Sequence, residues 1–342
     1  MAPTHRLLQA ARREPVDRTP IWFMRQAGRF LPAYRKLREG RSILELCGDP
    51  ELAAAAAMTA VDALPGLDAA IVFSDILQIL IPMGIQVEFV AGEGPRILNP
   101  VRSVADVDAL RPIEPDRDLP GPLGAIRILR RALDGRMPVI GFAGAPYTLA
   151  TYLIEGGPSR DYGRAKSFMA SEPAAWHALL SKLADAAIAH LLAQAAAGAE
   201  IVQLFDSWVG ALGVDDYRES VAPYSKRIFD ALRGKVPAVH FGTGTGALLE
   251  LMRDAGGDVI GLDWRVDLAD ARRRLGTGVA VQGNLDPAAL LYPRRELMRR
   301  VDAVLDRAAG RAGHIFNLGH GVLPETPVDN VISVIERVHD RK

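Results

Sequence analysis

Eight short apolar segments recur along the 342-residue chain, and a stretch of helical periodicity separates or follows most of them. Each segment is almost continuously apolar, which is typical of parallel strands covered on both faces. The segments are residues 21–24, 69–73, 139–142, 201–205, 238–241, 259–262, 279–282 and 314–317. This alternation predicts an α/β protein with a closed (β/α)8 barrel of the TIM type rather than an open sheet.

Helix and turn signals support this division of the chain. Asp49-Pro50 is a helix start, and Pro65-Gly66 ends the same segment. Residues 86–90, followed by a glycine-rich turn at 92–95, predict a hairpin outside the main repeat. No Pro/Ser-rich linker interrupts the sequence. We therefore expect one barrel domain over residues 1–342, with an N-terminal helical extension over about 1–18.

The composition limits the expected binding partners and the expected cellular location of the protein. Lys and Arg together number 41, as do Asp and Glu, so no overall field favours nucleic acid or an acidic membrane as a partner. The apolar runs are shorter than a membrane span, and no signal-peptide pattern opens the chain, so we expect a cytoplasmic protein. Cys47 is the only cysteine, which excludes an internal disulfide and a multi-cysteine zinc site.

One segment after the first apolar stretch is strongly basic. Six cations lie between residues 25 and 41, and no acid interrupts them before Glu39. Arginine grips carboxylates and phosphates through two parallel hydrogen bonds, and a glycine allows the backbone to approach a ligand closely. The sequence Arg25-Gln26-Ala27-Gly28-Arg29 is thus predicted to seat a small polyanion. A solvated helix face explains the later cations, Arg35 to Arg41, well, but explains Arg25 and Arg29 poorly.

Polar residues and glycines follow most of the predicted strands. In barrels of this type the chemistry is built at the carboxyl ends of the strands, from the loops that follow them. One large site at one mouth of the barrel is therefore expected. Its candidate segments are 25–29, 74–75, 144–157, 206–208, 242–244, 263–264, 282–284 and 318–321.

Several of these segments together resemble the motifs of the uroporphyrinogen decarboxylase family. They occur in the family's order and cover the chain from about residue 20 to its end. The Arg-Gln-Ala-Gly-Arg element is the most specific. The matching stretches are 24–32, 73–77, 141–146, 151–157, 261–264, 282–287 and 317–321.

The resemblance implies a distorted barrel, usually a homodimer, acting in tetrapyrrole biosynthesis. The implied reaction removes CO2 from the four acetate arms of uroporphyrinogen III to give coproporphyrinogen III, with neither a metal nor an organic cofactor. A protonated pyrrole ring can accept the electrons released with CO2. Such a site needs a grip on carboxylates, a group that stabilises the ring cation, and a proton source.

Asp75 is the candidate for stabilising the cation, because a carboxylate on the cavity floor can accept hydrogen bonds from pyrrole N–H groups. Its other interpretation is a helix cap after the second strand. Arg25 and Arg29 are expected to hold acetate and propionate carboxylates, with Arg38 a weaker candidate. Arginine is a poor acid, so the proton donor stays open.

Three further polar residues complete the predicted site. Tyr152 can hydrogen-bond an arm of the substrate or Asp75, and a buried core tyrosine is an equally good reading. Ser207 can bind a carboxylate, although a loop or cap serine also fits. His320, between two glycines, is the histidine best placed to bind a carboxylate or move a proton. Phe142 and Phe205 are expected in the barrel core or in the walls of the site.

Three other functions compete with this interpretation. Gly242-Thr-Gly244-Thr-Gly246, with Asp263 about twenty residues later, matches the dinucleotide fingerprint of NAD(P)-dependent oxidoreductases. Its fifth place among eight similar units argues against that function. Zinc methyltransferases with a similar barrel need a thiolate-rich site, which Cys47 alone cannot supply. A non-catalytic tetrapyrrole carrier would bind the macrocycle without turnover.

Overall fold

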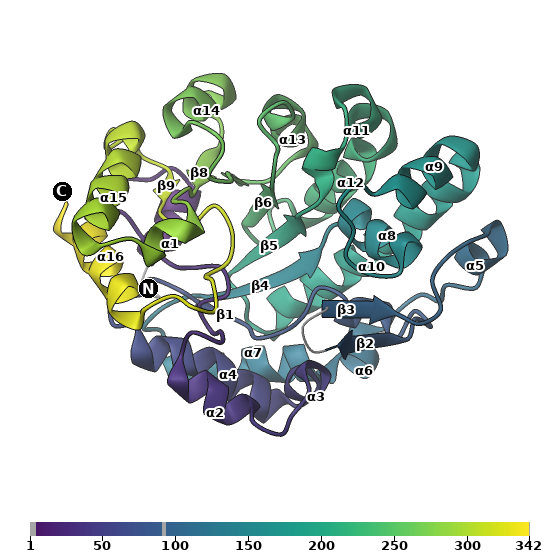
Figure 1. The fold of residues 1–342 in the computed structure, drawn as a ribbon, viewed down its shortest axis with the longest axis horizontal. Helices are drawn as coiled ribbons and strands as arrows, with labels where there is room; N and C mark the ends of the chain where they lie inside the picture. The colour runs from purple at the N-terminus through teal and green to yellow at the C-terminus, as the bar shows by residue number, and fades with distance from the viewer. Residues whose placement is uncertain (1–4, 91–93, 342) are drawn as a thin grey trace.

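The computed structural model describes residues 5–90 and 94–341. Its centre is a curled sheet of parallel strands in the order β1-β4-β5-β6-β7-β8-β9, ringed by helices (Figure 1). The strands are β1 (Ala70–Ile71), β4 (Val139–Gly144), β5 (Ile201–Asp206), β6 (Ala238–Gly242), β7 (Val259–Gly261), β8 (Ala280–Gln282) and β9 (His314–Ile315). All of them coincide with predicted segments, and the predicted α/β barrel is confirmed.

The eighth position of the barrel is a bridge rather than a strand. Ile21 pairs in parallel with Phe316 next to β9, and its carbonyl accepts the N–H of Asp68 before β1 at 2.8 Å. Residue 21 therefore joins the two edges of the sheet. The strand predicted over residues 21–24 does not form, because the chain turns at once: the N–H of Gln26 bonds the Phe23 carbonyl at 3.0 Å.

Helices pack around the outside of the sheet, and their ends carry the expected signals. The Asp49 side chain accepts the N–H groups of Glu51 and Leu52 at the start of α4, as predicted. Gly198, with φ +116°, ends the long helix α10. The longer helices are α4 (Pro50–Ala63), α7 (Pro120–Leu133), α8 (Pro146–Glu155), α9 (Gly163–Ser171), α10 (Pro173–Ala197), α12 (Ala222–Leu232), α14 (Leu268–Leu275), α15 (Arg294–Ala308) and α16 (Val328–Asp340).

Shorter helices fill the connections. They are α1 (Arg6–Ala11), α2 (Pro32–Arg38), α3 (Ile43–Gly48), α5 (Val104–Asp108), α6 (Pro115–Asp118), α11 (Val214–Ser220), α13 (Leu249–Ala255) and the 3₁₀ turns η1 (Gln78–Leu80), η2 (Val209–Ala211) and η3 (Pro287–Leu291). The predicted hairpin is present as the antiparallel pair β2 (Val87–Val90) and β3 (Gly94–Ile97). Part of its predicted turn, residues 92–93, lies outside the described residues. No helix of the described chain is long and apolar enough to cross a membrane.

The barrel interior contains a buried chain of amides. The Trp22 indole N–H donates to Gln282, whose amide donates to Gln203, each at 3.0 Å. The Gln203 amide in turn lies 3.5 Å from the sulfur of Met24. All four side chains are buried, so these polar groups satisfy one another in the core. The chain holds Met24, and with it the start of the Arg25 loop, against the sheet.

A polar clasp closes the opposite end of the barrel. The buried carboxylate of Asp68 accepts bonds from Arg6 on α1 at 2.7 Å and from the N–H of Ile21 at 2.9 Å. His339 on α16 lies 3.1 Å from the same carboxylate. The clasp therefore joins both ends of the chain to the seam at which the barrel closes.

Candidate active site

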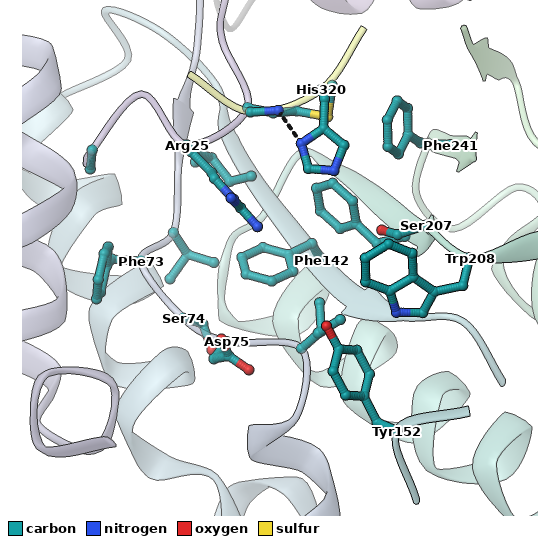
Figure 2. Close-up of a pocket in the computed structure, with 17 residues that line it drawn as sticks. Arg25, Phe73, Ser74, Asp75, Phe142, Tyr152, Ser207, Trp208, Phe241 and His320 are labelled. Carbon is teal, nitrogen blue, oxygen red and sulfur yellow. Dashed lines mark hydrogen bonds between the residues drawn. The ribbon is translucent and has the colours of Figure 1, made fainter. Parts of the chain in front are cut away.

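A cavity opens at the carboxyl ends of the strands, where the sequence predicts the site (Figure 2). Its floor is apolar: the rings of Phe142 and Phe205 meet edge to face at 5.4 Å, and those of Phe205 and Phe241 at 5.7 Å. The cavity is lined by Met24, Arg25, Ala27, Ile71, Val72, Phe73, Ser74, Asp75, Ile76, Phe142, Tyr152, Phe205, Ser207, Trp208, Phe241, His320 and Gly321.

Arg25 projects into this cavity from the turn that follows the barrel seam (Figure 2). Its backbone φ is +60°, a left-handed conformation that costs a non-glycine residue about 1 kcal/mol or more. A Cβ added to Gly321 would lie 2.7 Å from Cγ of Arg25, so this glycine makes room for the arginine stem. No acid lies within ion-pair distance of the guanidinium in the described residues, which leaves it available to an anionic ligand.

Asp75 lies across the cavity from Arg25 (Figure 2). One carboxylate oxygen accepts the N–H of Leu77 at 2.8 Å in the turn before η1, but the N-cap of η1 is Leu77 and has no side-chain bond, so Asp75 is not its cap. The other oxygen has no hydrogen-bond partner among the described residues. Burial raises the pKa of Asp75, while the Leu77 N–H and the charge of Arg25 oppose that rise. The site can therefore hold a carboxylate whose charge is only partly compensated, as a cation-stabilising group requires.

Tyr152 comes from α8, and its hydroxyl points into the cavity beside the indole of Trp208 (Figure 2). The two rings lie 6.0 Å apart, and Tyr162 lies against the same indole at 5.8 Å. Burial, with a contribution from the charge of Asp75, raises the pKa of Tyr152 to about 12. The phenol is thus a hydrogen-bond donor at neutral pH and not an anion.

His320 presents a neutral imidazole to the cavity. Its Nδ1 accepts the N–H of Gly321 at 2.7 Å, so in the neutral ring the proton resides on Nε2. Burial lowers the pKa of His320 to about 4, and the charges of Arg25 and Arg265 add to this shift. At neutral pH His320 can therefore donate a hydrogen bond to a carboxylate but is not an imidazolium acid.

Two further predicted residues, Ser207 and Ala27, also line the cavity. Gln26, Gly28 and Arg29, which are also predicted, do not line it. The buried amide of Gln26 donates to the Ala69 carbonyl and accepts the N–H of Phe23, each at 3.1 Å, so this side chain supports the loop instead of facing a ligand. Gly28 forms the turn, since an added Cβ would lie 2.9 Å from the Arg25 carbonyl oxygen. Both residues are predicted to contact substrate. In the structure the Gln26 side chain supports the loop, and the lack of a side chain at Gly28 allows the turn.

Arg29 lies outside the cavity in a shallow groove on α2, with Tyr34, Arg35, Lys36, Arg38 and one acid, Glu39. Tyr34 connects the two surfaces, because its ring packs 5.5 Å from that of Phe73 in the cavity wall. The predicted arginine pair is therefore divided. Arg25 belongs to the cavity, and Arg29 to an exposed cationic surface beside it.

The Gly242–Gly246 loop has a structural role, although its glycine pattern resembles a dinucleotide-binding motif. Its Gly244 N–H donates to the fully buried carboxylate of Asp263 at 2.6 Å, and Arg265 pairs with the same oxygen at 2.8 Å. The loop also packs so tightly on Gly210 that a Cβ there would lie 2.7 Å from the Gly244 Cα. The other Asp263 oxygen accepts the backbone N–H of Arg265 at 3.1 Å, so both oxygens already have partners, and α13 begins only at Leu249. These contacts exclude the dinucleotide interpretation of this loop.

The described residues contain no group of three or more His, Cys, Asp or Glu side chains placed to bind a metal. Cys47 is buried, and burial raises the pKa of its thiol, so it is a core residue.

Comparison with known proteins places the chain in a family. A family described as uroporphyrinogen decarboxylase (URO-D) matches residues 2–341. The uroporphyrinogen decarboxylase of Sorangium cellulosum is 55% identical over 335 residues, covering 98% of this chain and 95% of that protein. The chain belongs to the uroporphyrinogen decarboxylase family. The uroporphyrinogen decarboxylase of Roseiflexus sp. is 52% identical over 344 residues, covering 98% of this chain and 99% of that protein.

Solved structures support the barrel fold alone. A methyltransferase from Methanosarcina mazei matches with a TM-score of 0.82 at 19% identity, covering 98% of this chain and 97% of its own. A putative vitamin-B12-independent methionine synthase from Listeria monocytogenes matches with a TM-score of 0.60 at 12% identity, over 95% and 96% of the chains. The family predicted from the motifs is confirmed, and with it a carboxy-lyase.

The sequence analysis gives no role to two aromatic residues that line this cavity. They are Trp208, in the loop after β5, and Phe241, within β6. Trp208 follows Ser207, which is predicted to face the site. That adjacency in the Asp-Ser-Trp segment was the available signal for Trp208. Phe241 had no comparable signal, because it lies inside an apolar strand.

Proposed function

We infer that the chain decarboxylates the four acetate arms of uroporphyrinogen III to give coproporphyrinogen III. The observation that carries this proposal is the arrangement of one cavity: Arg25 lies on one side, Asp75 and Tyr152 lie on the other, and an apolar floor separates them. A tetrapyrrole has the matching form, with an apolar ring face, inward N–H groups and carboxylates at its edge. The family membership of the chain supports the same substrate.

Arg25 would bind a carboxylate arm, because its guanidinium lines the cavity and pairs with no acid among the described residues. The neutral Nε2–H of His320 and the hydroxyl of Ser207 add donors to the same rim. These contacts would orient one pyrrole over Phe142 and its neighbours. Binding energy from the other arms would hold the reacting ring in place.

Each decarboxylation would proceed through a ring cation. A proton adds to the pyrrole carbon next to the one that bears the acetate, which leaves the acetate-bearing carbon cationic, and the C–C bond to the carboxylate then breaks. CO2 leaves, its bonding electrons enter the cationic ring, and a proton adds to the methylene carbon. Loss of the first proton restores the pyrrole, so each acetate and one proton give a methyl group and CO2. The Asp75 carboxylate would accept the pyrrole N–H bonds and stabilise the cation.

Tyr152 would act beside Asp75 as a hydrogen-bond donor, since its pKa of about 12 keeps the phenol protonated. Arg29 and Arg38 would contact the outer propionates, because they line the groove next to the cavity wall. The sequence resemblance supports a cytoplasmic homodimer as part of this proposal. Light scattering should then give twice the chain mass of 36.9 kDa.

Anaerobic incubation with uroporphyrinogen III tests the function directly. The products would be oxidised and separated by carboxylate number. We expect intermediates that lose one to three carboxylates, followed by coproporphyrin as the end product. Tight binding of the macrocycle with no loss of carboxylates would instead identify a carrier.

A further inference from the structure

We propose that Thr148 and Asp206 are positioning residues for the decarboxylation, because they join α8 to the loop after β5 and so set Tyr152 against Trp208. The proposal rests on the proposed function above. The two hydrogen bonds that make this junction are called the Thr148 tether.

The tether uses the Thr148 hydroxyl both as a hydrogen-bond donor and as an acceptor. Thr148 lies in the first turn of α8 and is fully buried. Its Oγ1 donates to Oδ1 of Asp206 at 3.1 Å and accepts the backbone N–H of Trp208 at 3.2 Å. Asp206 ends β5, so a single side chain holds the helix to both the strand end and the loop after it.

Both cavity residues affected by the tether lie close to it. Tyr152 is one helical turn beyond Thr148, so the two side chains share one face of α8. The Trp208 ring lies 6.0 Å from that of Tyr152, and their polar ends are adjacent (Figure 2). Trp208 also lowers the pKa of the Tyr152 phenol, against the larger effect of burial. A shift of the Trp208 backbone would therefore change the position and hydrogen bonding of the Tyr152 hydroxyl.

The energetics of Asp206 suggest that it does more than fill the core. Its side chain is fully buried, and Oδ2 has no hydrogen-bond partner among the described residues. Burial raises its pKa to about 7, and hydrogen bonds from the hydroxyl and the backbone of Thr148 only partly oppose that rise. An apolar side chain would avoid the cost of burying this acid. The contact that distinguishes the acid from such a residue is its bond to Thr148.

The test compares variants of one helix. Thr148→Val keeps the side-chain volume but removes both bonds, whereas Thr148→Ser keeps the hydroxyl. Thr151→Val is the matched control, since Thr151 is equally buried on α8 and its hydroxyl bonds only the Thr148 carbonyl, at 2.7 Å. We expect Thr148→Val to lower kcat about tenfold with KM changed less than about twofold, because Arg25 is untouched. Thr148→Ser should restore kcat, and Thr151→Val should leave it unchanged.

Two measurements separate positioning from stability. Thermal unfolding should show similar losses for Thr148→Val and Thr151→Val, since each loses buried hydrogen bonding in the same helix. The Trp208 emission, obtained by subtracting the spectrum of Trp208→Phe, should shift only in Thr148→Val. Asp206→Asn keeps an acceptor oxygen for Thr148 and should retain kcat within about twofold.

An unchanged kcat and an unshifted Trp208 emission in Thr148→Val would overturn the positioning role. A tenfold loss in Thr151→Val would do the same, because it would make the effect a general consequence of destabilising α8. These results differ from a failure of the proposed function, in which the unmodified chain itself would not decarboxylate uroporphyrinogen III.

Discussion

At the scale of single residues, the cavity depends on small and neutral groups as much as on charges. Gly321 provides the space through which the Arg25 stem reaches the cavity. The Gly321 N–H also sets the tautomer of His320, which faces the cavity as a neutral donor. One glycine therefore affects both the cationic and the neutral contacts of a bound carboxylate.

Gly321→Ala should weaken substrate binding. The added methyl would meet Cγ of Arg25 at 2.7 Å, so the guanidinium must move. We expect KM to rise about tenfold while the melting temperature changes little, because the clash falls on a side chain in an open cavity. Gly278→Ala is the control, since nothing lies within 4 Å of a Cβ added at Gly278. Equal KM values for both variants would show that Gly321 does not govern the arginine.

The neutrality of His320 predicts a particular pH dependence. Its pKa is lowered to about 4, so the ring stays uncharged as the pH falls through the ordinary histidine range near 6.5. Unmodified protein and His320→Gln should therefore show parallel profiles of kcat/KM from about pH 8 to 5. A limb near pH 6.5 that disappears in the variant would mean that His320 ionises there.

At the scale of elements, the sequence pattern predicted most of the barrel, because strands and helices carry strong local signals. The Asp49-Pro50 cap and the apolar run of β5 are examples. The prediction of a strand over residues 21–24 was wrong, because the apolar side chains there reflect burial in the barrel and not pairing along a strand. The amide chain through Gln203 and Gln282 was not foreseen, because each glutamine has its partner far away in sequence.

The site residues also divide into those that local sequence signals predict and those whose role depends on distant partners. Arg25, Asp75, Tyr152 and His320 follow or adjoin strand ends, so topology brought them to one mouth. Gln26 stands in the same loop, yet its amide turns inward to the Ala69 carbonyl. Nothing in a single sequence distinguishes a polar side chain that supports a loop from one that faces a ligand.

The clasp at the base of the barrel gives a prediction on stability. Asp68→Asn removes a buried negative charge that pairs with Arg6 and lies beside His339. We expect a loss of about 2–3 kcal/mol in the free energy of unfolding by urea, because two partners from α1 and α16 lose their anion. Asp185→Asn is the control: its pair with Arg227 is exposed and should contribute less than about 1 kcal/mol.

The pH dependence of this contribution follows from the carboxylate. Burial alone would raise the pKa of Asp68, but bonds from His339 and Arg6 bring it below its usual value. The stabilisation is therefore present above the unfolded pKa near 4 and is lost as the pH falls through the lower folded value. The difference between the unmodified chain and Asp68→Asn should be constant near neutral pH. A difference that disappears already near pH 6 would contradict this assignment.

At the scale of the whole molecule, charge is distributed unevenly although it sums to zero. The guanidinium groups of Arg35, Arg38 and Arg41 bond backbone carbonyls and pair with no acid in the described structure. The groove that Arg35 and Arg38 line adjoins the cavity wall through Tyr34 and Phe73. A polyanion approaching the mouth would therefore meet a local positive field.

Lys36→Glu should lower kcat/KM about threefold at low salt and leave kcat unchanged, since the field acts on encounter. The difference should vanish near 1 M salt, where charges are screened within about 3 Å. Lys235→Glu is the control, because Lys235 is exposed just before β6, at the amino ends of the strands. A salt-independent loss in Lys36→Glu, or an equal loss in Lys235→Glu, would exclude steering by α2.

The most direct test of the account is the activity and binding of Asp75→Asn. The amide keeps the size of the side chain and an acceptor for the Leu77 N–H but has no charge to stabilise a ring cation. We expect the variant to bind uroporphyrinogen III with nearly unchanged affinity while losing most of its turnover, at least about a hundredfold. Turnover equal to that of the unmodified chain would contradict it.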